Sequence, residues 1–391
     1  MSLDKNIPKS KSKGFRDIRL NARPEDLGML KAALTAIRDR AAEPALADRE
    51  KTILARLTDA LNAAVSPEHV PDAANPFRLE GFELEEMRQI PQADHARYLR
   101  YRYKYKVYPR EHIVEDYPPC VQIEPSAACN YRCIMCYQTD KSFTDPAAGH
   151  MSMMSLELFK SAVDQLHGHC EAVTLASRGE PLMNPQIKEM LAHAAGKFLG
   201  LKVNTNAYFL DEAMSHALLS AGVSTLVFSA DAADEELYEK IRVRGKFKRV
   251  VENITRFREI QAKHYSGSRT ITRVSGVKLN DAQKIDDMSK HWGGLVDQVA
   301  FVNYQPWETS YSNPANDIVE PCTDLWRRMF LWSDGRVNPC DYDYKSTLCV
   351  GNANERPLLD IWNGEKYEAL RRDHLEKRRS SRSPCHQCVI I

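Results

Sequence analysis

The sequence contains no apolar run near the roughly 18–20 residues that a membrane-spanning helix needs. Its net charge at pH 7 is only +1, so the chain as a whole has no excess charge that would attract nucleic acid or another polyanion. The opening residues MSLDKNIPKSKSKGF are basic and lack the apolar segment of a secretory signal. Internal repeats are also missing. These absences predict a cytoplasmic protein without a membrane partner and disfavour a nucleic-acid partner.

What remains is the composition of an ordinary soluble protein. The 391 residues are 43% hydrophobic and 27% charged, which suits one large α/β domain with appendages or two to three smaller units. The ten cysteines are unusual, and most of them gather in two groups far apart in the chain. A disulfide framework is typical of short secreted chains. Metal ligation is therefore the better interpretation.

The first hundred residues contain helical patterns. Apolar residues recur at helical spacing after Asp26 and again after Asp48, which predicts a helical hairpin. The later segment YLRYRYKYKVYPR (98–110) alternates tyrosines with basic residues. At the period of a strand, this alternation predicts an extended segment with its rings packed on the main domain and its cations in water. The alternative is a basic ribbon that binds nucleic acid beside a zinc-bearing module.

From residue 119 onward, strand patterns alternate with amphipathic helical patterns. This alternation favours a parallel sheet with right-handed crossovers, in which the chemistry lies at the carboxyl ends of the strands. The predicted strands are residues 120–125, 172–177, 201–206, 224–231, 271–278 and 297–303. The predicted helices lie near 155–168, 185–197, 211–221, 234–263 and 281–291. After about residue 310 the alternation ends and a short cysteine-bearing module begins.

The first cysteine group is the trio Cys129, Cys133 and Cys136, spaced C-x3-C-x2-C in CNYRCIMC just after the first predicted strand. Three thiolates on one loop are typical ligands of an iron–sulfur cluster. A four-iron cluster needs four ligands, so the trio leaves one iron open to a small molecule. Zinc is the alternative, but the trio has no fourth ligand nearby, since His150 lies fourteen residues after Cys136.

The cysteine trio resembles the signature loop of the radical S-adenosylmethionine (SAM) superfamily. The resemblance implies that the open iron chelates SAM, and that reduction cleaves SAM to a 5′-deoxyadenosyl radical that abstracts hydrogen from a substrate. Within the loop it implies a SAM contact for Met135. The segment SRGEP (177–181) is similar to the GGEP motif of that family, with Arg178 in place of the first glycine. Gly179 would allow close backbone approach, and Glu180 would bind the SAM ammonium group.

Polar residues at the next strand ends extend the resemblance. Asn204 and Asn206 point the same way by strand alternation and are expected to reach the ribose or carboxylate of SAM. Ser229 and Asp231 resemble an S-x-D segment whose serine meets the ribose. Arg242 is expected to pair with the SAM carboxylate. The alternatives are a strand-end cap for the asparagines and a surface ion pair for the arginine.

The second cysteine group is the quartet Cys322, Cys340, Cys385 and Cys388. Asp334-Gly335 lies between apolar stretches and predicts a hairpin within it. Taken alone, the quartet also suits a zinc site. After a radical SAM core, it resembles the twitch or short SPASM extension of the same family. The resemblance implies one auxiliary [4Fe-4S] cluster, and four thiolates would leave it without an open iron and suited to electron transfer.

Three cysteines lie outside the trio and the quartet. Cys120 and Cys170 flank predicted strands and are expected to be buried structural thiols. Cys349 lies within the C-terminal module, and the alternative to a structural role is that its thiol returns a hydrogen atom to the substrate of an epimerase.

These observations predict an α/β protein with a partial (β/α)6 TIM-like radical SAM barrel. The expected division is a helical and extended region at 1–116, the barrel at 117–309 and an α+β cysteine module at 310–391. The expected cofactors are SAM, a [4Fe-4S] cluster and one auxiliary [4Fe-4S] cluster, with flavodoxin or ferredoxin as reductant. The leading function is dehydrogenation of a hydroxyl in a sugar, aminocyclitol or nucleotide sugar. Epimerisation, dehydration and peptide maturation are the alternatives.

Overall fold

The computed structural model describes residues 16–17, 26–66 and 68–390. It divides into two compact units, one of Arg19–Val114 and one of Met1–Ile18 with Glu115–Ile391. The predicted boundary between barrel and cysteine module, at 309/310, falls inside the larger unit and stays a prediction. None of the described helices is long and apolar enough to cross a membrane.

The smaller unit is helical. It contains α1 Asp26–Ala41, α2 Asp48–Val65, α3 Gly81–Gln89 and α4 His95–Glu111. The first two form the predicted hairpin, in which Ile37 and Leu57 are completely buried whereas Leu27, at the start of α1, is exposed. A capping box begins α3, where Glu80 and Glu83 satisfy each other's backbone N–H groups.

The prediction of an extended segment at 98–110 is wrong, because these residues lie in helix α4. Tyr98, Tyr101 and Tyr105 also recur at three- and four-residue spacing, and their neighbouring rings lie 6.2 and 6.0 Å apart along the helix. Arg102 is buried and pairs with Glu83 at 2.7 Å. The alternating residues were compatible with the period of a strand and with that of a helix, and the packing of their side chains favours the helix. A ribbon with one basic face therefore does not form.

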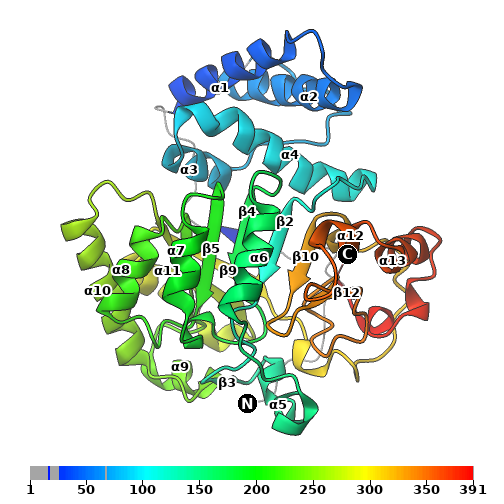
Figure 1. The fold of residues 1–391 in the computed structure, drawn as a ribbon. Coiled ribbons are helices and arrows are strands. Elements are labelled where there is room, and N and C mark those ends of the chain that lie inside the picture. The colour runs from blue at the N-terminus through cyan, green and yellow to red at the C-terminus, as the bar shows by residue number, and fades with distance from the viewer. Residues whose placement is uncertain (1–15, 18–25, 67, 391) are drawn as a thin grey trace. The chain divides into compact units, whose positions relative to one another are not determined.

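The larger unit contains the six predicted strands, all parallel and neighbouring in chain order. They are β2 Cys120–Ile123, β4 Ala172–Leu175, β5 Gly200–Thr205, β6 Thr225–Ser229, β8 Ile271–Lys278 and β9 Gln298–Asn303. The crossover helices are α6 Leu156–Leu166, α7 Ile187–Ala194, α8 Glu212–Ser220, α9 Glu235–Ile241, α10 Phe247–His264 and α11 Ile285–Gly293 (Figure 1). The short helix α5 Lys141–Thr144 follows the cysteine trio. This is the predicted partial (β/α)6 barrel.

The single helix predicted over 234–263 is interrupted. Strand β7, Arg242–Val243, separates α9 from α10 and pairs antiparallel with β3, Arg132–Cys133. The turn needs Gly245, because a Cβ there would lie 2.6 Å from the carbonyl oxygen of Arg242. Residues 242–243 thus pair with the cysteine loop instead of continuing the predicted helix.

The C-terminal module continues the main sheet. Strand β10, Arg328–Leu331, pairs parallel with β2, and β11 Arg336–Asn338 and β12 Gly351–Asn352 follow beyond it. The predicted hairpin turn at Asp334-Gly335 is confirmed, with Gly335 at φ +90°. Helices α12 Leu358–Trp362 and α13 Glu365–Leu375 complete the module. At the other edge of the sheet, β1 Arg16–Asp17 pairs antiparallel with β9.

Candidate radical and cluster sites

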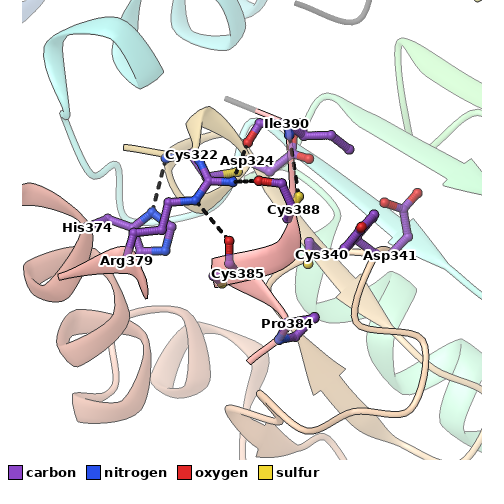
Figure 2. A pocket seen from close by; sticks show the side chains of 11 residues that line it. Cys322, Asp324, Cys340, Asp341, His374, Arg379, Pro384, Cys385, Cys388 and Ile390 are labelled. Atoms are coloured by element: carbon purple, nitrogen blue, oxygen red, sulfur yellow. Dashed lines mark hydrogen bonds between the residues drawn. The ribbon is translucent and has the colours of Figure 1, made fainter. Parts of the chain in front are cut away.

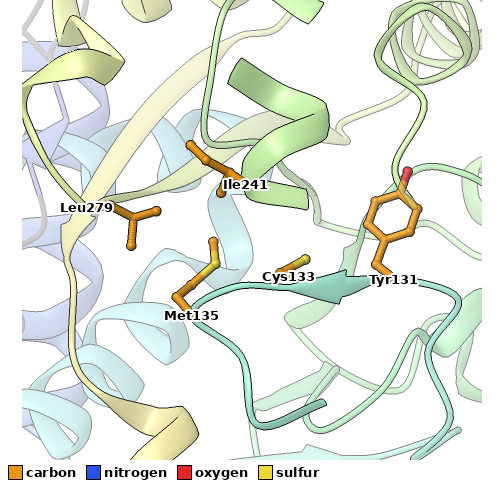
Figure 3. Packing of buried hydrophobic residues seen from close by; sticks show 5 residues of the cluster. All are labelled: Tyr131, Cys133, Met135, Ile241 and Leu279. Atoms are coloured by element: carbon orange, nitrogen blue, oxygen red, sulfur yellow. The ribbon is translucent and has the colours of Figure 1, made fainter. Parts of the chain in front are cut away.

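The fold brings the cysteine trio together at the carboxyl end of β2. Cys133 lies in β3 opposite Arg242 of β7. It is buried in an apolar cluster with Tyr131, Met135, Ile241 and Leu279, and Cys129 and Cys136 pack against the same cluster (Figure 3). The three thiols therefore line one region, and Met135 lies among them; its contact with SAM stays a prediction.

The trio fits a metal cluster electrostatically. Burial raises the pKa of all three thiols, that of Cys136 to about 12. The cation nearest to Cys133 is Arg242, whose Nη1 lies 3.9 Å from the sulfur. Buried thiols of this kind become thiolates only when positive charge is supplied beside them. Iron would supply that charge, so the donor set suits an iron–sulfur cluster.

Glu180 is held rigidly beside the trio. Its carboxylate accepts hydrogen bonds from the Thr205 hydroxyl at 2.6 Å and from the N–H groups of Asn206 at 2.7 Å and Leu182 at 3.1 Å. Burial nevertheless raises its pKa to about 7. The three donors are neutral, so an ammonium group bound here would meet a carboxylate prepared for it.

Gly179 permits this placement. A Cβ at Gly179 would lie 2.3 Å from the carbonyl oxygen of Ala128 and 2.4 Å from that of Ser126. The Glu180 N–H donates to the same Ala128 oxygen at 2.9 Å. The SRGEP loop therefore lies directly against the start of the cysteine loop, as the close approach predicted for glycine requires.

The two predicted asparagines lie beside this loop. Asn206 Nδ2 donates to Asn130 at 2.8 Å and lies 3.9 Å from the sulfur of Cys129. Asn204 has a buried Oδ1 without a hydrogen-bond partner. A buried orphan acceptor is a position that a donor of a bound ligand can satisfy.

The predicted S-x-D residues and Arg242 lie at the next strand end. Asp231 is fully buried and forms an ion pair with Arg242 at 2.7 Å. Its carboxylate also accepts from the Val277 N–H at 2.6 Å. The arginine pair is thus buried rather than on the surface, and it lies against Cys133. Ser229 ends β6, half-buried. SAM contacts for these residues stay predictions.

The cysteine quartet lines one small cavity in the C-terminal module (Figure 2). Burial and the neighbouring thiols raise the pKa of Cys340 and Cys385, so these sulfurs lie close enough to repel one another as thiolates. Arg379 encloses the cavity by donating to the carbonyl oxygens of Cys385 at 3.3 Å and Cys388 at 2.6 Å. His374 Nδ1 accepts from the Cys322 N–H at 3.1 Å.

Among the described residues, no three His, Cys, Asp or Glu side chains converge closely enough to hold a single metal ion. A four-iron cluster takes one thiolate on each iron, so its ligands surround a volume and do not converge on a point.

The three remaining cysteines have different surroundings. Cys120 is buried at the start of β2, and Cys170 is buried with its sulfur 3.3 Å from the Ala172 carbonyl oxygen, as expected of structural thiols. Cys349 is half-buried and donates to the Gly351 carbonyl at 3.3 Å. Its role as a hydrogen donor stays a prediction.

Glu308 is a candidate that sequence reasoning missed. It lies in the 3-10 turn Trp307–Thr309, beyond the carboxyl end of β9, and this turn packs against the turn that follows Cys136. One carboxylate oxygen accepts from the Tyr304 hydroxyl, and the other is buried without a partner. Burial raises its pKa, and its charge acts on Cys136. Its only sequence signal is its place just after the last predicted strand.

Two family models match the chain. The radical SAM superfamily matches residues 123–288, and the SPASM iron–sulfur cluster-binding domain matches residues 322–389. Among curated proteins, an AdoMet-dependent heme synthase of Methanosarcina barkeri is 26% identical over 65% of this chain and 85% of its own length. A dTDP-4-amino-4,6-dideoxy-D-glucose ammonia-lyase of Streptomyces venezuelae is 28% identical, over 38% of this chain and 31% of its own length.

The fold also resembles that of a solved structure. Streptococcus suis SuiB aligns over 95% of this chain and 90% of its own, with 16% identity and a TM-score of 0.51. At this identity the likeness concerns the fold alone.

Proposed function

Because this chain belongs to the radical SAM superfamily and carries a C-terminal SPASM iron–sulfur domain, we propose that it oxidises a hydroxyl-bearing carbon of a sugar-like substrate. Its cofactors are SAM, a [4Fe-4S] cluster on the trio and auxiliary iron–sulfur in the SPASM domain. When bound, they supply a 5′-deoxyadenosyl radical that takes hydrogen from carbon and an acceptor for the electron that remains. The protein must position the substrate, SAM and a base.

The observation that carries the proposal is that one side chain lies between the two cysteine groups. The Trp307 ring stacks on Tyr137, which follows Cys136, with centroids 6.3 Å apart. The same ring packs against the apolar cluster of Tyr342, Cys388 and Ile390. The trio and the quartet therefore flank a common region. This arrangement supports an auxiliary cluster that exchanges electrons with chemistry at the first site.

Glu308 is the base in this proposal. Oxidation of an alcohol removes a hydrogen atom, an electron and the hydroxyl proton. Glu308 follows Trp307 directly, and its charge acts on Cys136 of the trio and on Tyr344 of the C-terminal module, so its carboxylate lies near both. The free buried oxygen is a hydrogen-bond acceptor for a substrate hydroxyl, and the Tyr304 hydroxyl orients the other oxygen.

Glu180→Gln is expected to weaken SAM binding about ten- to a hundred-fold without removing the first cluster. The change removes a charge-assisted hydrogen bond worth about 1.5–3 kcal/mol, while the amide oxygen can still accept from the Asn206 N–H. Equilibrium SAM binding to the anaerobically reconstituted protein measures the effect. The exposed Glu189→Gln is the control. Unchanged affinity in a cluster-loaded Glu180→Gln protein would show that the carboxylate does not bind SAM.

The reaction type is tested in D2O with glucosamine, myo-inositol and UDP-glucose as representatives of the substrate class. A dehydrogenated product should gain a carbonyl and lose two mass units apart from exchangeable sites, with one SAM consumed per product. Mass spectrometry measures both. A product with an unchanged hydrogen count and one carbon-bound deuterium would contradict the oxidation. If Cys349→Ala then removed that label, the enzyme would be an epimerase with Cys349 as its hydrogen donor.

A further inference from the structure

Arg178, which replaces a glycine of the family motif, is one of the most deeply buried charges in the described chain. It is 1% exposed, and its partner Glu124, just after β2, is 0% exposed. The guanidinium donates to both carboxylate oxygens, from Nε at 2.7 Å and from Nη2 at 2.6 Å. The backbone N–H of Arg178 donates to the same carboxylate at 3.1 Å. This bidentate pair fixes both the side chain and the backbone of residue 178.

The same pair is bonded to the C-terminal module. Arg178 Nη1 donates to the Tyr344 carbonyl at 2.9 Å, and the guanidinium lies 4.4 Å from the ring centroid of Trp332. Glu124 accepts from the N–H and hydroxyl of Ser333 at 3.1 and 2.8 Å. Residues 332, 333 and 344 all belong to the segment that carries the quartet ligand Cys340. The charged pair therefore bonds the barrel to the module that holds the second cysteine group.

Arg178 is also connected to Glu180 through a short and confined piece of backbone. Only Gly179 separates the two residues, and Gly179 is confined by the carbonyl oxygens of Ser126 and Ala128. The preceding Ser177 has φ 137°, a conformation that an L-residue adopts only when its surroundings impose it. A shift of Arg178 would therefore be transmitted through Gly179 to the backbone of Glu180, whose carboxylate is assigned to the SAM ammonium group.

We propose that Arg178 is a positioning residue that couples SAM binding to the state of the C-terminal cluster module. When the quartet is loaded, the module holds Tyr344 and Ser333 in place, and these hold the Arg178–Glu124 pair and the SRGEP loop. By reciprocity, SAM binding stabilises the loaded module by the same free energy. The inference rests on the assignment of Glu180 to SAM in the proposed function.

A thermodynamic cycle on full-length reconstituted protein tests this coupling. Its corners are the native protein, Cys385→Ala/Cys388→Ala, Arg178→Met/Glu124→Gln, and all four changes together. The readout is equilibrium SAM affinity, with iron content and the electron paramagnetic resonance signal of the first cluster measured alongside. Removing both charges at once avoids leaving one buried and unpaired.

Loss of the quartet should weaken SAM binding about tenfold in the native background, within the range typical of allosteric coupling. In the Arg178→Met/Glu124→Gln background the same loss should change the affinity little. Equal weakening in both backgrounds, or none in the native one, would overturn the proposal. Arg178→Lys is the second variant, since it keeps the charge but loses the fork that binds Glu124 and Tyr344 together, and it should weaken the coupling.

Two further variants distinguish failure of this proposal from failure of its premise, which is the assignment of Glu180 to SAM. Arg371→Met is the matched control, because Arg371 is a buried guanidinium of the same module that stacks 4.3 Å from Trp362 and has no bond to the SRGEP loop among its described contacts. It should leave the cycle unchanged. Glu180→Gln tests the premise: if it binds SAM normally, the SAM assignment fails. If it is weakened and the cycle shows no coupling, only the role of Arg178 fails.

Discussion

Replacing Cys129, Cys133 and Cys136 together with alanine is expected to leave about four of about eight irons and to abolish SAM cleavage. The quartet lines a cavity of its own in the C-terminal module, so the iron of a cluster bound there should remain. Iron and sulfide analysis of anaerobically reconstituted protein gives the count, and 5′-deoxyadenosine formation under reductant gives the activity. No residual cleavage is expected, because the open iron that chelates SAM is lost with the trio.

The double variant Cys120→Ala/Cys170→Ala is the matched control for this loss. Both thiols are buried and lie outside the two groups, so iron content should stay near eight. An iron count near four in the native protein, or tightly held zinc at the quartet, would contradict the two-cluster interpretation. If the triple variant still cleaved SAM, the trio would not be part of the active site.

Glu308→Gln is expected to lower product formation about 10²–10⁴-fold, the usual contribution of a general base. SAM binding and cluster content should be unchanged, because the Glu308 side chain makes no described hydrogen bond to the SRGEP loop or to a cysteine of either group, and it acts on Cys136 only through its charge. SAM should still be cleaved, so 5′-deoxyadenosine would form in excess over oxidised product. Both products are measured in the same reaction by mass spectrometry.

The pH dependence provides the sharper readout for Glu308. Burial raises its pKa, and only the carboxylate form accepts the substrate proton. The rate of oxidation should therefore rise with pH through this raised pKa, and the rise should disappear in Glu308→Gln. Tyr304→Phe, which removes the orienting hydroxyl, should reduce the rate less. If the Glu308→Gln enzyme kept the native rate and pH profile, Glu308 would not be the group that accepts the substrate proton.

The sequence alone determined the features that depend on local pattern. The six strands are short apolar or alternating runs separated by amphipathic helical patterns, so their positions and their parallel order followed from residues 120–303. The cysteine trio and the SRGEP loop could also be identified from the sequence, because the functional residues of each lie close together in the chain. Where one pattern fitted two periods, as at residues 98–110, or where a distant strand intervened, as at Arg242–Val243, the prediction was wrong.

Only the tertiary structure decided how the two cysteine groups are related. The parallel pairing of β10 with β2 places the C-terminal module against the barrel, and no local pattern encodes a pairing between residues two hundred positions apart. The pairing of β2 with β4 brings Glu124 beside Arg178, and the pairing of β10 with β2 adds Tyr344. Trp307 contacts Tyr137, which follows Cys136, and also packs against the cluster that contains Cys388. The role proposed for Arg178 could not be read from its neighbours in the sequence, because the groups that pack beside it come from distant parts of the chain.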